Sequence, residues 1–141
     1  MYSSFEDLEV WKRACQLAVL VYQTLQPCKD YSLRDQMQRA AVSVASNIAE
    51  GHERGAKEFS HYLKIARGSA SELRTQAYIA TRIGLLNTQQ AQHIVEETKQ
   101  INAMLFALSR SVHVKPNTWA ENWKLQTENL FMKIWAFAVK Q

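Results

Sequence analysis

Residues that end helices or form tight turns are rare in this sequence. Its 141 residues include only four Gly and two Pro, whereas a β-sandwich or barrel needs many turns and therefore many such residues. Between these breaks, apolar side chains recur every three or four residues, which is the period of one face of an α-helix. The sequence therefore predicts an all-α protein, and its length fits one domain of ~100–200 residues.

Capping and breaking residues define the first two predicted helices. Ser4 caps a helix over residues 5–26, which Pro27 stops. Ser32 caps the second helix, which Gly51 ends or bends, and Ala residues on one of its faces allow a partner helix to approach closely. The apolar stripe predicted for the first helix consists of Leu8, Trp11, Cys15, Ala18, Tyr22 and Leu25.

Two further helices complete a bundle. The third covers residues 55–84, where Gly84 stops it, and Gly68 in its middle indicates close packing or a local kink. Asn87 or Thr88 starts the fourth, which continues as far as Pro116. Four helices joined by short turns predict an up-down-up-down four-helix bundle over residues 1–115.

Residues 116–141 predict an additional C-terminal helix with an aromatic, amphipathic character. Thr118 and Glu121 have the spacing of a capping box. An exposed apolar face of this size indicates an interface, either with the bundle itself, with a neighbouring subunit or with another protein. The flanks of this segment are only weakly cationic, which argues against binding to a membrane surface. The predicted interface residues are Trp119, Trp123, Leu130, Phe131, Ile134 and Trp135.

A polar cluster flanks the apolar stripe of the second helix. Ser43 and Asn47 lie one helical turn apart and need hydrogen-bond partners where they are buried. We expect a structural network that fixes the helix register. The alternative is a catalytic or metal site, but His52 and His61 lie far apart and the sequence has no HExxH motif or glycine-rich phosphate loop. We therefore predict no enzymatic activity, cofactor or metal. The expected network comprises Arg39, Ser43, Asn47, Glu50, Arg54 and Glu72.

Basic residues concentrate in the middle of the chain. The formal net charge is +4, and residues 34–82 hold eight basic and five acidic side chains. At ~100° per residue, five cations of the third helix share one solvent-side quadrant. Such a quadrant is either a solvated helix face or a surface for a phosphate backbone. Phe59 and Tyr62 fall on the core side, so the binding would not use stacking. The five candidate nucleic-acid-binding residues are Lys57, Lys64, Arg67, Arg74 and Arg82.

Several motifs over residues 5–112 are shared with a known family. They include RAAVS at 39–43, SNIAEG at 46–51 and GSxxEL at 68–73. On these motifs the chain resembles the bacterial four-helix-bundle family encoded in intervening sequences of large-subunit ribosomal RNA genes. Ala45 stands where the family often has Pro, which predicts a straighter second helix. The C-terminal segment is longer and more aromatic than the usual family end, so nothing about it is inherited.

The resemblance implies a protomer that assembles as a ring, typically a homopentamer, without established catalysis. It also implies a relation in fold to the accessory variability protein of retroelements, which binds a reverse transcriptase and nucleic acid. We therefore predict a non-enzymatic ring protein that binds RNA or DNA, or a nucleoprotein. The alternative is an adaptor or accessory subunit, for example of a reverse transcriptase, that uses its C-terminal aromatic helix. Isolated Cys15 and Cys28 and a polar N-terminus predict a cytoplasmic protein without a membrane segment.

Overall fold

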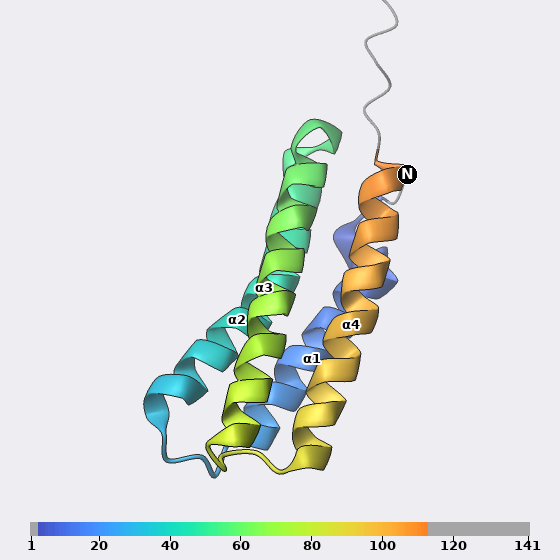
Figure 1. Ribbon diagram of the computed structural model, residues 1–141. Coiled ribbons are helices and arrows are strands. Elements are labelled where there is room, and N and C mark those ends of the chain that lie inside the picture. Colours follow the sequence, from blue (N-terminus) through green and yellow to red (C-terminus); the bar gives the residue numbers. More distant parts are fainter. Residues whose placement is uncertain (1–2, 113–141) are drawn as a thin grey trace, which may run out of the picture.

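The computed structural model describes residues 3–112, which form helices and no strand (Figure 1). This part of the chain confirms the all-α prediction, and none of its helices is long and apolar enough to cross a membrane. The C-terminal helix predicted over 116–141, including its proposed interface residues, lies outside the described residues. The elements are the 3-10 helix η1 (Phe5–Asp7) and the α-helices α1 (Glu9–Leu25), α2 (Tyr31–Arg54), α3 (Ala56–Arg82) and α4 (Thr88–Ser111).

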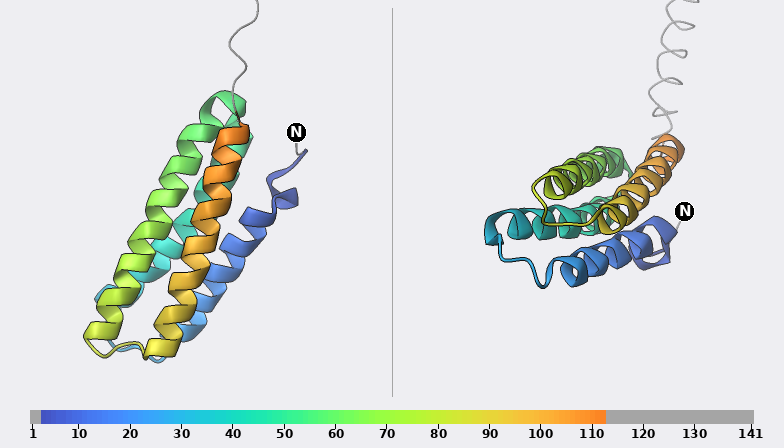
Figure 2. Two further views of the ribbon diagram at one scale, coloured as in Figure 1. Left: turned by 45° about the vertical axis from the view of Figure 1, so that its right-hand side comes forward. Right: turned by 60° about the horizontal axis from the view of Figure 1, so that its bottom comes forward.

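The four α-helices lie side by side, and each packs against two others (Figure 2). α2 contacts α1 and α3, while α4 contacts α3 and α1. Figure 1 places the α1–α2 and α3–α4 connections at one end of the molecule and the α2–α3 connection at the other. The contacts agree with this arrangement, because Ser43 pairs with Ser69 whereas the later α2 residue Glu50 pairs with the earlier α3 residue Tyr62. Neighbouring helices α2 and α3 are therefore antiparallel.

One apolar core runs between the four helices. Leucine, isoleucine, valine and alanine side chains supply most of it. On α1 the buried stripe is rotated relative to the sequence prediction, since Tyr22 is 49% exposed while Leu17 and Val21 are buried. α1 has two overlapping apolar faces, and packing against α2 and α4 buries the face that was not predicted. The buried residues of α1 are Val10, Ala14, Leu17, Val21 and Leu25.

Two expectations about helix starts need correction. The side chain of Ser4 caps η1, while α1 begins at Glu9 without a side-chain cap. α2 is capped by Asp30 rather than Ser32, because the Asp30 carboxylate accepts a hydrogen bond from the backbone N–H of Leu33 at 3.1 Å. Asp is as good an N-cap as Ser. Both shifts are small and leave the order of the elements unchanged.

Gly51 does not end α2, which was one of the two alternatives that the sequence left open. It is buried inside the helix, where an added Cβ would overlap the Cβ of Tyr62 and lie 3.2 Å from Cδ2 of Phe59. Glycine at this position therefore permits the close approach of α2 and α3. α2 ends instead before Gly55, whose φ of 98° lies in the region that glycine favours.

α3 continues without interruption through Gly68, and of the two alternatives predicted there, close packing or a local kink, the structure excludes close packing. An added Cβ at Gly68 would meet no atom within 4 Å. Gly84, with a φ of 79°, follows the end of α3, and the N–H of Leu85 donates to the carbonyl of Ala80 at 2.9 Å. The predicted stop at Gly84 is confirmed. Asn87, one of the two predicted starts, begins α4 and forms a capping box with Gln90.

Candidate nucleic-acid interface

The five cations predicted from the sequence all lie on α3, and together they are called the α3 basic face. Three are exposed and two are half-buried. Within residues 3–112 every ion pair uses a cation outside this set. No contacting carboxylate of the described residues therefore neutralises these charges. The exposed members are Lys57, Lys64 and Arg82, and the half-buried members are Arg67 and Arg74.

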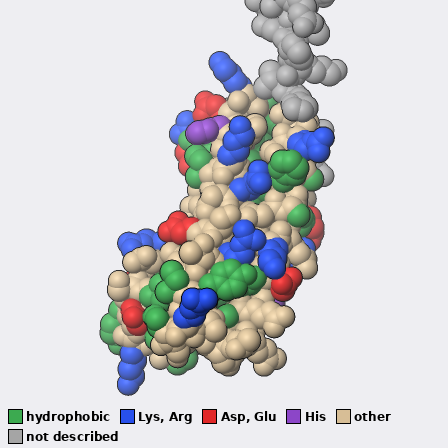
Figure 3. All heavy atoms as spheres, in the orientation of Figure 1, with side chains coloured by type: hydrophobic (Ala, Val, Ile, Leu, Met, Phe, Trp, Pro, Cys, Tyr) green, Lys and Arg blue, Asp and Glu red, His purple; other side chains and the backbone are tan. Residues whose placement is uncertain are grey.

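The edge of α3 that faces α4 carries more than positive charge. Figure 3 shows Lys and Arg side chains over α3 and the adjoining surface of α4, with hydrophobic side chains between them. Cζ of Arg67 lies 4.9 Å from the ring centroid of Phe106 on α4, and Cζ of Arg110 lies 5.8 Å from the same centroid. Phe106 remains 47% exposed. Cation–π attraction thus holds two guanidinium groups beside an accessible ring.

The contact between α3 and α4 continues along both helices. One turn beyond Arg67, the Ser71 hydroxyl accepts a hydrogen bond from Nδ2 of Asn102 at 3.1 Å. Asn102 precedes Phe106 while Ser71 follows Arg67, so α3 and α4 are antiparallel here. Nε of Arg67 and Oδ1 of Asn102 are buried and have no hydrogen-bond partner among the described residues. These two buried polar atoms are therefore not satisfied by the packing of α3 against α4 alone.

A shallow groove of about 340 Å³ lies between the end of α3 and the start of α4. Tyr78 lines it and is 53% exposed. Arg82 of α3 and Lys99 of α4 line the same groove, where Lys99 also pairs with Glu96 at 3.4 Å. A second accessible aromatic ring thus lies close to two cations. We call this surface the α3–α4 seam; it consists of Arg67, Arg74, Tyr78, Arg82, Lys99, Phe106 and Arg110.

Phe59 and Tyr62 lie on the core side of α3, as predicted, whereas the aromatic residues of the seam were not predicted as part of a site. Phe59 is buried and Tyr62 is half-buried. Tyr78 was detectable, because rotation at ~100° per residue puts it within the basic quadrant of α3. Phe106 gave no such signal, since its position beside Arg67 depends on how α4 packs against α3.

The expected polar network is divided in the structure. One cluster lies between α2 and α3, where the hydroxyls of Ser43 and Ser69 are 2.8 Å apart. Nδ2 of Asn47 donates to Oγ of Ser43 at 2.9 Å and to its carbonyl oxygen at 2.8 Å. These residues are half-buried or buried, so their hydrogen bonds satisfy polar groups between α2 and α3.

The second cluster lies at the exposed end of α2. Arg54 contacts Glu50 at 2.9 Å and Glu58 at 3.4 Å, and the Tyr62 hydroxyl donates to Glu50 at 3.3 Å. Glu72 lies apart from both clusters and accepts a hydrogen bond from Nε2 of Gln76 at 3.3 Å. Arg39 is exposed, and no hydrogen bond joins it to either cluster in the described part of the chain.

Comparison with known proteins identifies the family. A sequence model of the family described as 23S rRNA-intervening sequence protein matches residues 6–107. The chain belongs to this family. A solved structure from Bacteroides thetaiotaomicron, described as a protein of unknown function from the S23 ribosomal protein family, matches with a TM-score of 0.66 and 23% identity. The match covers 71% of this chain and 97% of that one, and at this identity it shows the fold alone. No curated protein matches.

The intervening-sequence family match spans η1 to most of α4. The matched range contains every residue of the α3–α4 seam except Arg110, which lies beyond residue 107, where the match ends. The C-terminal residues predicted as an interface lie beyond the match as well as outside the described residues.

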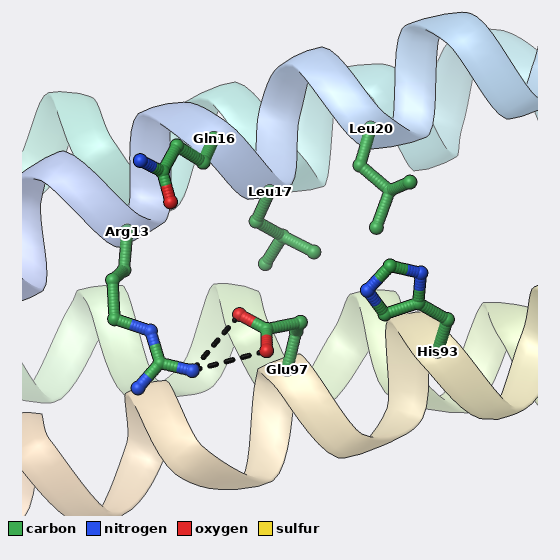
Figure 4. Close-up of a pocket in the computed structure, with 6 residues that line it drawn as sticks. All are labelled: Arg13, Gln16, Leu17, Leu20, His93 and Glu97. Carbon is green, nitrogen blue, oxygen red and sulfur yellow. Dashed lines mark hydrogen bonds and ion pairs between the residues drawn. The ribbon is translucent and has the colours of Figure 1, made fainter.

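This family member also has a pocket that the sequence did not indicate (Figure 4). Arg13 reaches from α1 to α4, where its Nη2 donates to both carboxylate oxygens of Glu97 at 3.0 and 3.1 Å and to Oε1 of Gln100 at 2.6 Å. Leu20 and His93 line the same pocket. The guanidinium is already paired, so this site joins α1 to α4 rather than presenting a free charge. Among the described residues no cluster of three or more His, Cys, Asp or Glu is placed to hold a metal ion.

Proposed function

We propose that this chain is a non-enzymatic, ring-forming helical-bundle protein that binds nucleic acid, or a nucleoprotein, through the α3 basic face. The supporting observation is the absence of carboxylate partners for all five of its cations within residues 3–112. Most of the other described Lys and Arg residues, such as Arg13 and Arg54, are paired. An unpaired surface cation can neutralise a phosphate and release its counterion, which is the main source of affinity without sequence specificity.

In this proposal the protomer is an up-down-up-down bundle with an added C-terminal helix over residues 116–141. That helix packs on its own bundle or on a neighbouring subunit, and the assembly is a cytoplasmic ring, typically a homopentamer, as the resemblance to ring-forming relatives implies. Rotational repetition would bring several copies of the α3 basic face into one band of positive potential. Such a band contacts more phosphates than one protomer does, and the salt dependence of binding becomes correspondingly steep.

The proposal is tested by measuring affinity for RNA and DNA over a range of salt concentrations. Three neutralising substitutions on the α3 basic face should weaken binding and flatten the plot of log K against log salt concentration by about 0.7–0.9 for each phosphate that the protein no longer neutralises. Three control substitutions outside α3 remove the same charge and should leave the slope almost unchanged. The test set is Lys64→Gln, Arg74→Gln and Arg82→Gln, and the control set is Lys12→Gln, Lys29→Gln and Arg39→Gln.

Two results would refute this function. The first is no binding of RNA or DNA by the unsubstituted protein at low salt. The second is an equal loss of affinity in the test and control sets, which would show that net charge rather than the α3 basic face controls binding. In either case the adaptor function predicted for the C-terminal aromatic segment becomes the better hypothesis.

A further inference from the structure

The α3–α4 seam contains two accessible aromatic rings in a strongly basic setting. Phe106 is 47% exposed and Tyr78 is 53% exposed. The ring of Phe106 lies beside guanidinium groups from both helices. Tyr78 shares its groove with Arg82, which has no carboxylate partner among the described residues, and with Lys99, which pairs with Glu96 in the same groove. A solvated helix face requires charge but no exposed rings. The combination matches the groove of proteins that bind single-stranded nucleic acid, which joins positive charge with stacking platforms.

The two rings are too far apart to hold one small ligand. Arg67, which contacts Phe106, and Tyr78 are eleven residues apart on α3. At a rise of ~1.5 Å per residue this separation is about 16 Å along the helix. Arg74 lies between them on the same helix and is half-buried. The order along the seam is therefore ring, cation, ring, which requires a long ligand that alternates flat aromatic groups with negative charge.

We propose that a single strand of nucleic acid lies along the α3–α4 seam, with bases stacked on Phe106 and Tyr78 and phosphates close to the neighbouring cations. This inference rests on the proposed function and adds the form of the ligand. A duplex keeps its base faces within its own stack, so it can use only the cations of the seam. An acidic peptide would likewise pair with the cations but supplies no regular series of aromatic faces. Unstacked bases use both features of the seam.

The experiment compares a labelled, unstructured strand of about 20 nucleotides with the duplex of the same sequence, by fluorescence anisotropy. Phe106→Leu and Tyr78→Leu keep the charge and an apolar side chain but remove the ring. Each should weaken binding of the single strand by about 5-fold or more, corresponding to at least ~1 kcal/mol per stacked base. Duplex affinity and the salt slope of both ligands should stay unchanged, because no cation is removed.

The matched control is Tyr22→Leu. Tyr22 is 49% exposed and lines a groove between α1 and α2 together with Arg34. It therefore has a similar exposed fraction and an arginine neighbour, but lies on α1, which is not part of the seam. Its substitution should leave single-strand affinity unchanged. Circular dichroism and native mass measurements on all three variants check that fold and assembly are retained.

The outcomes separate this inference from the proposed function. If the single strand and the duplex bind with salt-dependent affinity and neither Leu variant at the seam changes it, stacking is refuted while binding through the α3 basic face stands. The same conclusion follows if polyglutamate of equal charge displaces the strand as well as unlabelled strand does. If neither nucleic acid binds at low salt, the proposed function and this inference both fail.

Discussion

Replacement of Gly51 by alanine should destabilise the protein, although alanine is the better helix former. Within a helix, Gly→Ala normally stabilises by ~0.5–1 kcal/mol. At Gly51 the new Cβ would overlap the Cβ of Tyr62 and lie 3.1 Å from its Cγ. A Cβ atom cannot rotate away, so α2 and α3 must move apart, and overpacking of this kind costs ~1–3 kcal/mol. Because the overlap is with an atom next to the backbone, we expect a net loss of about 2 kcal/mol in the free energy of unfolding.

Gly68→Ala is the matched control, because Gly68 is also inside a helix but has no atom within 4 Å of an added Cβ. This variant should gain ~0.5–1 kcal/mol. Urea unfolding followed by far-UV circular dichroism measures both, at one fixed protein concentration because assembly would make stability concentration-dependent. With a typical m of ~1–3 kcal/mol/M, the Gly51→Ala midpoint should fall by about 1 M and the Gly68→Ala midpoint should rise. Equal stabilisation of both variants would refute the close contact between α2 and α3 at Tyr62.

Three further predictions concern other parts of the chain. Arg13→Met should lower the free energy of unfolding by about 1 kcal/mol, because the partly buried ion pair with Glu97 is lost. A double-mutant cycle with Glu97→Gln measures the interaction energy between the two side chains, and a value of zero would contradict this. Burial raises the pKa of the Cys15 thiol, so a smaller fraction of it is thiolate at neutral pH. In a Cys28→Ser background, iodoacetamide should therefore label Cys15 slowly at neutral pH and faster as the pH rises. Labelling at neutral pH at the rate of a free thiol would refute this. Deletion of residues 117–141 should lower the melting temperature or change the oligomer mass, and a truncated protein unchanged in both would show that this segment forms no interface.

Local sequence signals correctly predicted where α3 stops and where α4 starts. Gly84 stops α3 and Asn87 caps α4 because the required backbone angle and the capping hydrogen bonds depend only on nearby residues. The two glycines inside helices could not be interpreted in this way. Gly51 and Gly68 look alike in the sequence, yet only Gly51 faces a neighbouring helix closely. Their difference arises from tertiary packing, which the local pattern does not contain.

The prediction of which face of α1 is buried was wrong for a related reason. Two apolar stripes of helical period overlap on this helix, one through Cys15 and Tyr22 and the other through Ala14 and Val21. Periodicity alone does not choose between them. The positions of α2 and α4 make the choice, and they bury the second stripe.

Some residues of the candidate site could be predicted from one helix alone, whereas others depend on how two helices pack. The five cations of the α3 basic face belong to one helix, so rotation along that helix was enough to group them. Phe106 and Arg110 come from α4, and a sequence separation of about 40 residues from Arg67 leaves no periodic signal. A charged face can therefore be predicted from one helix, whereas the aromatic part of the site requires knowledge of the helix pair.

The charge distribution on α3 also bears on why this face exists. Lys64 and Arg67 are three residues apart, and like charges at this spacing destabilise a helix by ~0.2–0.5 kcal/mol. A face that only kept the helix solvated could alternate its charges, as Arg54 does between Glu50 and Glu58. Removal of the Lys64 charge should therefore raise stability slightly at low salt whether the face is merely solvated or binds a ligand. Only for a binding surface does nucleic-acid affinity fall in the same variants, so measuring stability and affinity together distinguishes the two explanations.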